Sequence, residues 1–204
     1  MHITAEKIAE WAKTKEAQAF LPRLVRRLVH AAGDSKQASF PAGESTALPG
    51  WDGELQSEHG SPWVPKGKSF CEFSCDAKIT TKANKDYDKR TGQTSNKIRA
   101  KDSLVVITAR RWSQKEKWLK EKRHAKQWAE IRAYDADDLE QWLEQSTAVA
   151  LQFAEELGLR GPGVESIVRH WEDWSQQSHP SITREAFFID RQDVPDRFLT
   201  DLQH

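Results

Sequence analysis

The chain has 204 residues, of which 30% are charged and 37% hydrophobic, and its 31 basic and 31 acidic side chains give a formal net charge of zero. Nine tryptophans and eight phenylalanines are too many large apolar residues for a disordered chain. We do not expect a membrane protein, because no run approaches the roughly 18 consecutive apolar residues of a membrane helix. The first residues lack a signal-peptide pattern, and two cysteines make no disulfide framework. We therefore expect a cytoplasmic protein of one or two domains.

The N-terminal segment, residues 3–32, has apolar side chains at helical spacing. Thr4 is the expected N-cap and Gly33 the expected stop. We expect a break near Pro22, because proline fits the first turn of a second helix. Prolines and glycines then recur at short intervals in residues 37–64, which predicts short strands and turns.

Two strands are predicted in the middle of the chain. Residues 69–75 alternate, so that Glu72 points to one side with Phe70 and Ser74, and the two cysteines point to the other side. Residues 103–108 form a continuous apolar run, which is typical of a buried central strand. The polar residues 80–99 between these strands are predicted to be helical.

The C-terminal part alternates between short elements. Residues 113–129 predict an amphipathic helix that begins after Ser113. A strand is expected at 130–134, and Asp135 is expected to cap a helix that contains Leu139, Trp142 and Leu143. Further helices are expected at 148–157, with Gly158 as the stop, and at 164–176. This order indicates an α/β fold with a mixed sheet. We expect one domain in residues 1–160 and a helical linker in residues 161–204, after the glycines and proline at 161–163.

The zero net charge conceals a strong asymmetry along the chain. Residues 1–65 carry 7 basic and 8 acidic side chains, residues 66–126 carry 18 and 7, and residues 127–204 carry 6 and 16. A middle third with a net charge of +11 is typical of a nucleic-acid-binding face. The alternative is a solvated basic surface that pairs with the acidic C-terminal third.

The candidate metal ligands are Asp52 and Glu72. Asp52 lies between glycines, which permit a tight bend, and Glu72 lies in a predicted strand among apolar residues. A carboxylate in such a strand is costly unless it is paired or bound to a cation. Two carboxylates from adjacent strands can hold Mg²⁺. The alternative is that Asp52 is a turn residue and Glu72 lies on a solvated face.

The motif Gly50-Trp51-Asp52-Gly53, with Glu72 twenty residues beyond Asp52, resembles the Gly-x-Asp-Gly and Glu/Gln-x-Lys motifs of Mrr-type nucleases. These nucleases are a branch of the PD-(D/E)xK superfamily. More narrowly, four phrases resemble the N-terminal nuclease module of large bacterial antiphage defence ATPases of the STAND class, namely residues 49–53, 82–90, 107–112 and 133–139. The resemblance covers residues 16–160. It implies a restriction-endonuclease-like fold, DNA as the partner, and regulation by homo-oligomerisation.

The resemblance also implies an NTPase domain and a sensor domain downstream of the nuclease module. We therefore expect the present chain to be a truncated piece of a longer protein. No phosphate-binding loop of the Gly-x-x-x-x-Gly-Lys-Ser/Thr type occurs in these residues, so we do not expect ATP hydrolysis.

The sequence departs from the nuclease motif at one position. Ser74 stands two residues after Glu72, where the family has a lysine. Lys78 and Lys82 could supply the missing charge from the next segment, and Lys82 is our choice because it falls in the first turns of the following helix. If neither lysine reaches the carboxylates, the domain binds nucleic acid without cutting it.

Five basic residues are candidates for contacts to nucleic acid. Lys85, Lys89 and Arg90 have near-helical spacing, so they could face a phosphate backbone or form a solvated helix face. Arg110 and Arg111 follow the predicted central strand, a common place for ligand contacts in open α/β sheets. One of these two arginines could instead bond the acidic third.

We therefore expect a Mg²⁺- or Mn²⁺-dependent endodeoxyribonuclease, with the ion between Asp52 and Glu72 and with Lys82 orienting the attacking water. A non-catalytic DNA-binding or assembly module of the same fold is the main alternative. A protein-interaction adaptor that uses the acidic helical third is a further one.

Overall fold

The computed structural model describes residues 3–33, 35–41, 50–159, 167–183 and 185–186. The chain divides into two compact units, Met1–Leu159 and Arg160–His204. Among the described residues of the second unit, helix α8 (Ile167–Ser175) lies within the helix expected at 164–176. The expected linker at 161–163 falls outside the described residues.

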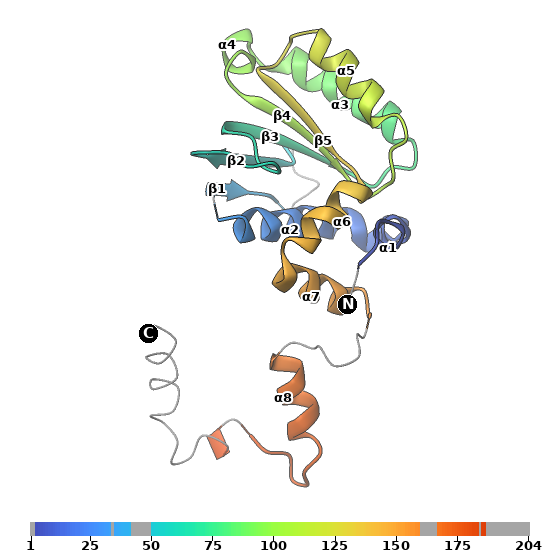
Figure 1. Ribbon diagram of the computed structural model, residues 1–204, viewed down its shortest axis with the longest axis vertical. Coiled ribbons are helices and arrows are strands. Elements are labelled where there is room, and N and C mark those ends of the chain that lie inside the picture. Colours follow the sequence, from blue (N-terminus) through green and yellow to red (C-terminus); the bar gives the residue numbers. More distant parts are fainter. Residues whose placement is uncertain (1–2, 34, 42–49, 160–166, 184, 187–204) are drawn as a thin grey trace. The chain divides into compact units, whose positions relative to one another are not determined.

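A five-stranded mixed sheet forms the centre of the first unit (Figure 1). The strands are β1 (Ser35–Ser39), β2 (Gly53–Ser57), β3 (Gly67–Ser74), β4 (Ser103–Thr108) and β5 (Glu130–Tyr134), and their spatial order follows the sequence. β1, β2 and β3 pair antiparallel, whereas β3, β4 and β5 pair parallel. The predicted α/β class and the predicted strands at β3, β4 and β5 are thereby confirmed.

Helices cover both faces of this sheet (Figure 1). One face carries α3 (Ile79–Gln93) and α5 (Lys115–His124), and the short α4 (Asn96–Arg99) follows α3. The other face carries α2 (Lys15–Ala31) and α6 (Ala136–Glu144). Two further helices pack against these: α1 (Ala5–Trp11) contacts α6, and α7 (Thr147–Glu156) contacts both α2 and α6.

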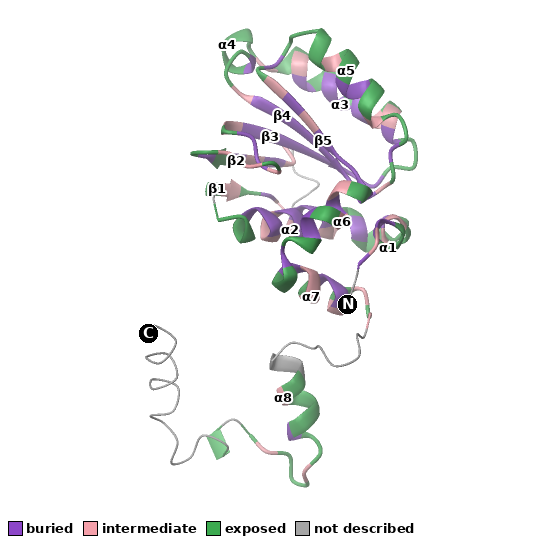
Figure 2. Ribbon diagram, in the orientation of Figure 1, coloured by how far each residue is buried: buried purple, intermediate pink, exposed green. Residues whose placement is uncertain are grey.

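The central strands are buried on both sides (Figure 2). Side chains along β3 point alternately to the two faces of the sheet, as the sequence predicted, and so belong to two separate core clusters. Phe70 belongs to the cluster under α3 and α5, whereas Cys71 and Phe73 belong to the cluster under α1, α2 and α6. Glu72 and Ser74, which share the side of Phe70, are also buried.

The N-terminal helices meet at a different place from the one expected. The chain leaves α1 after Trp11, and Thr14 starts α2 by accepting a hydrogen bond from the Ala17 N–H at 3.3 Å. Thr4 caps α1 as predicted. Pro22 does not begin a helix but lies buried inside α2, where packing of the apolar helix face outweighs the lost backbone hydrogen bond.

Helix α5 is shorter than the helix predicted at 113–129. Gln114, and not Ser113, is the N-cap, and the helix ends at His124. Lys126 adopts a left-handed φ of 50°, which stops the helix before Trp128. Trp128 nevertheless joins the core from the loop, and its indole N–H donates to Thr91 Oγ1 at 3.0 Å.

The Asp135 side chain forms hydrogen bonds both to the loop after β4 and to α6, the helix after β5. It caps α6 in a capping box with Asp138, as the sequence predicted for the cap position. Its Oδ2 also accepts the Trp112 N–H at 3.1 Å, and its Oδ1 accepts from Lys115 Nζ at 3.0 Å. One buried carboxylate therefore satisfies donors from three segments.

No helix among the described residues has both the length and the apolar composition that a bilayer crossing requires.

Helix α7 stops as expected, because Gly158 adopts a φ of 67° directly after the C-cap.

We predict that Asp135→Ala lowers the free energy of unfolding by roughly 2–4 kcal/mol, because a helix cap is lost and buried donors are left unpaired. Urea denaturation measures the change. Asp137→Ala is the matched control in the same turn, since Asp137 is 52% exposed and pairs with the exposed Arg111. This control should change stability by less than about 1 kcal/mol. Equal effects of the two substitutions would contradict the role of Asp135.

Candidate functional site

Asp52 and Glu72 are brought together where β2 pairs with β3. Gly53 lies opposite Cys71 in the antiparallel register, so Asp52 and Glu72 are the next residues along the two chains. The Phe73 N–H donates to Asp52 Oδ2 at 3.0 Å, which fixes the Asp52 carboxylate against β3. The charge of Asp52 contributes to a raised pKa of Glu72, so the two groups interact electrostatically.

Two glycines shape the turn that carries Asp52. Gly50 has a φ of 141°, which residues with a side chain rarely adopt. Gly53 lies against the ring of Phe40, and a Cβ at this position would approach Phe40 Cδ1 to 2.2 Å. Glycine is therefore needed at the two positions for different reasons: at position 50 for the backbone conformation, and at position 53 because a side chain would meet Phe40.

Glu72 is 4% exposed and is held by Arg90. Arg90 Nε donates to Glu72 Oε1 at 2.5 Å, and a second guanidinium nitrogen, Nη2, donates to the Gly50 carbonyl oxygen. The guanidinium also lies 4.5 Å above the ring centre of Trp51. Burial and the Asp52 charge raise the pKa of Glu72 to about 7, despite the opposing effect of Arg90.

The pKa of Asp52 is raised as well, chiefly because burial disfavours the charged carboxylate. The Phe73 N–H and the positive charges of Arg90 and Lys82 oppose this shift, and the Asp86 charge adds to it. Both carboxylates therefore pay an electrostatic penalty that a nearby cation would relieve.

Helix α3 presents a stripe of three charged side chains to this place. Lys82, Asp86 and Arg90 are spaced four residues apart, which puts them on one face of the helix. Lys82 Nζ donates to both carboxylate oxygens of Asp86, at 2.6 and 2.5 Å. Sequence reasoning missed Asp86, although the i, i+4, i+8 spacing of alternating charge was a signal for it.

A cleft of about 480 Å³ opens beside Asp52, at the carboxyl ends of β3 and β4. Lys82 lines this cleft with Asp52, whereas the exposed Lys78 does not. Arg110 lines it too and donates from Nε to the Cys75 carbonyl oxygen at 2.8 Å. The other lining residues are Ala12, Lys13, Thr14, Gln18, Phe73, Ser74, Cys75 and Asp76.

The five basic residues expected to contact nucleic acid have different surroundings. Lys85 and Lys89 are exposed on α3, and Arg110 reaches the cleft. Arg111 is exposed and lies 3.3 Å from Asp137 in an ion pair with the acidic third. Arg90 differs from the expectation, because it is 6% exposed and engaged with Glu72. The guanidinium of Arg90 is therefore not open to a phosphate backbone in this conformation.

Each of the two carboxylates uses one of its oxygens in a contact with the protein. Asp52 is anchored through Oδ2 and Glu72 through Oε1. None of the described residues donates a hydrogen bond to Asp52 Oδ1 or Glu72 Oε2. Asp52 lines the cleft, whereas Glu72 is 4% exposed and is followed in sequence by the lining residues Phe73 and Ser74. No cluster of three or more His, Cys, Asp or Glu able to hold a metal occurs in the described ranges. Two carboxylates are nevertheless a common protein contribution to Mg²⁺, which keeps several waters.

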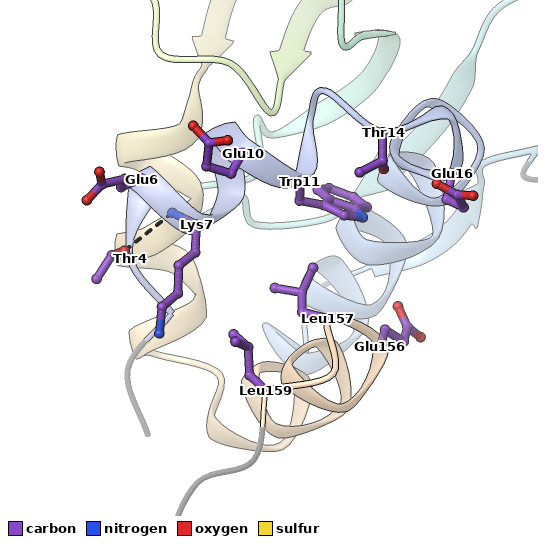
Figure 3. A pocket seen from close by; sticks show the side chains of 10 residues that line it. All are labelled: Thr4, Glu6, Lys7, Glu10, Trp11, Thr14, Glu16, Glu156, Leu157 and Leu159. Carbon is purple, nitrogen blue, oxygen red and sulfur yellow. Dashed lines mark hydrogen bonds between the residues drawn. The ribbon is translucent and has the colours of Figure 1, made fainter.

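A larger groove of about 750 Å³ lies elsewhere, between α1, the start of α2 and the end of α7 (Figure 3). Its floor is apolar, with Trp11, Leu157 and Leu159, and acidic side chains stand around it. None of the candidate site residues lines it. Because its rim carries mainly glutamates, this groove is unsuited to a phosphate backbone.

Comparison with protein-family models, with curated proteins and with solved structures finds no match to this chain.

The raised pKa of Glu72 makes stability depend on pH. The folded state keeps a proton on Glu72 up to a pKa of about 7, whereas the ordinary value is 4.5, so the folded state binds more protons between these values. Stability should therefore fall as pH rises through this window. We predict that the free energy of unfolding of the wild type, relative to Glu72→Gln, falls by roughly 3 kcal/mol between about pH 4.5 and pH 7 and then levels off.

Urea denaturation of both proteins at closely spaced pH values checks this prediction. Glu54→Gln is the control, since Glu54 is a half-exposed glutamate on β2 that pairs with the half-exposed Lys68. A difference between wild type and Glu72→Gln that stays constant across the window would show that the Glu72 pKa is not raised.

Proposed function

We propose that this chain is a metal-dependent DNA endonuclease domain. The observation that carries the proposal is the register that sets Asp52 next to Glu72, each anchored through one carboxylate oxygen, with Asp52 lining a cleft that Lys82 and Arg110 also line. The likeness of the motifs around Asp52 and Glu72 to Mrr-type nucleases points to the same chemistry. It extends the proposal to a bacterial defence effector whose NTPase and sensor domains lie downstream and whose activity depends on oligomerisation.

In this proposal Asp52 Oδ1 and Glu72 Oε2 hold Mg²⁺ or Mn²⁺. When bound, the ion supplies positive charge to the scissile phosphate and lowers the pKa of a bound water. The protein contributes the fixed separation of the two carboxylates, which the β2–β3 register and the Phe73 N–H set.

Lys82 orients the attacking water through its ammonium group. The water oxygen forms a bond to phosphorus and gives up a proton to solvent, while the bond from phosphorus to the leaving oxygen breaks and the leaving oxygen takes up a proton from solvent. The ammonium group also offsets negative charge that builds on the phosphate. Asp86 keeps the ammonium near the cleft by binding it with both oxygens.

The basic middle third holds the DNA in this proposal. Lys85 and Lys89 contact phosphates outside the cleft, and Arg110 contacts the phosphate inside it. Arg111 would contact DNA after exchange of its exposed ion pair with Asp137, which costs little because exposed pairs are weak.

A second candidate is a DNA-binding or assembly module that does not cut. Two observations favour it: Ser74 stands at the usual lysine position, and Arg90 already provides a positive charge at Glu72. In this candidate the Glu72–Arg90 pair replaces the metal ion and has only a structural role. Cleavage assays separate the two candidates.

We predict that the protein nicks or linearises plasmid DNA in Mg²⁺ or Mn²⁺ and that Asp52→Ala, Glu72→Gln or Lys82→Ala reduces the rate by at least about 100-fold. Gel electrophoresis of supercoiled plasmid measures the loss. Lys97→Ala is the control, since Lys97 is an exposed lysine on α4 outside the cleft, and it should cut as the wild type does. DNA that is bound but left intact by the wild type under every divalent ion would favour the second candidate.

We predict that the double variant Lys85→Ala, Lys89→Ala binds duplex DNA more weakly and with a salt dependence whose log–log slope is smaller by about 2, because two phosphate contacts are lost. Fluorescence anisotropy at several salt concentrations measures both quantities. The effect should be the same for unrelated DNA sequences. An unchanged slope would show that these two lysines form a solvated face instead.

A further inference from the structure

The Arg90 side chain contacts both segments that carry the candidate metal ligands. Nε binds Glu72 Oε1 at 2.5 Å on β3, and Nη2 binds the Gly50 carbonyl oxygen in the turn before Asp52. The ring of Trp51, the residue next to Asp52, lies 4.5 Å below the guanidinium. With 7% of the side chain exposed, these contacts take place away from bulk water.

A second link joins the same two segments from the other side. The backbone N–H of Phe73, the residue after Glu72, donates to Asp52 Oδ2. Arg90 therefore ties the turn to Glu72, and Asp52 ties the turn to the backbone beyond Glu72. Together the two links hold the carboxylates of Asp52 and Glu72 in place relative to each other.

Arginine suits this position for a geometric reason. Its planar fork can serve a carboxylate and a carbonyl at once while one face stacks on an aromatic ring, whereas lysine offers one compact charge. The fork is presented by α3, a helix of 15 residues whose Ala83 and Tyr87 are buried against the sheet. A packed helix is a rigid support for a group that must orient others.

We propose that Arg90 is a positioning residue of the divalent-metal site and not a contact to DNA. It holds Glu72 by one oxygen so that the other stays available, and it fixes the Gly50–Trp51 turn so that Asp52 faces the same ion. Metal-binding carboxylates are commonly held by such outer partners. This inference rests on the proposed function, because it assigns a role toward the ion that the nuclease proposal requires.

The test compares Arg90→Lys, which keeps the positive charge but loses the fork, with the wild type as the full chain. Titration calorimetry with Mn²⁺ alone, without DNA, measures the affinity of the site. We expect Arg90→Lys to weaken Mn²⁺ binding by about 10–100-fold, the usual effect of removing an outer partner of a metal ligand.

Hydrogen exchange of the Phe73 amide gives a second readout that needs no metal. Because this N–H donates to the Asp52 side chain, its exchange reports whether Asp52 stays docked on β3. We expect exchange in Arg90→Lys to be faster on the order of tenfold or more. Trp51→Leu, which removes the stacking ring and keeps the charge, should shift both readouts in the same direction by a smaller factor.

Arg99 provides a matched control. It is another buried arginine, 9% exposed, and it donates to the carbonyl oxygens of Thr94 at 3.0 Å and Gln127 at 2.9 Å. Arg99→Lys should reduce general stability in a similar way but leave Mn²⁺ affinity and Phe73 exchange at their wild-type values.

The outcomes separate the two proposals. Wild-type Mn²⁺ affinity and wild-type Phe73 exchange in Arg90→Lys would overturn the positioning role, and so would tighter Mn²⁺ binding, which would make Arg90 a competitor of the ion. Equal changes in Arg90→Lys and Arg99→Lys would reduce the effect to general stability and overturn it too. A wild type that binds no Mn²⁺ and cuts no DNA would instead overturn the proposed function. In that case Phe73 exchange alone would test whether Arg90 links the turn to Glu72.

Discussion

The buried ion pair between Glu72 and Arg90 is the interaction on which the candidate site depends. Burial of a lone carboxylate in the middle of β3 would be costly, and the guanidinium makes it tolerable. The same guanidinium reaches the backbone before Asp52. A single side chain from α3 therefore stabilises a charged residue in the sheet and aligns a neighbouring turn with it.

Charge balance around this pair leaves room for a further cation. The cluster contains three carboxylates, Asp52, Glu72 and Asp86, and two cationic side chains, Lys82 and Arg90. Ionisation of every group would leave a surplus of one negative charge. Burial is the main cause of the raised pKa values of Asp52 and Glu72, and the Asp52 charge adds to the shift at Glu72. A proton on Glu72 relieves that surplus at low pH, and a divalent ion would relieve it at higher pH.

Local patterns in the sequence predicted the elements whose cause is local. The alternation of residues 69–75, the apolar run of β4 and the Asp135 cap each depend on neighbouring residues, and the structure confirms them. The break between α1 and α2 was predicted wrongly because Thr14 provides a competing N-cap. The end of α5 was predicted wrongly because Lys126 adopts a left-handed φ and the helix stops before Trp128. The burial of Arg90 was hidden for a related reason: α3 is polar on most sides, so its sequence does not reveal which face meets the sheet.

The contact between Gly53 and Phe40 has a consequence for how such sequences diverge. Because the ring of Phe40 occupies the space where a Cβ at position 53 would lie, any side chain at 53 requires a smaller residue at 40. These two positions should therefore change together among descendants of this chain. Their covariation would show that the close contact beside the Asp52 turn has been kept.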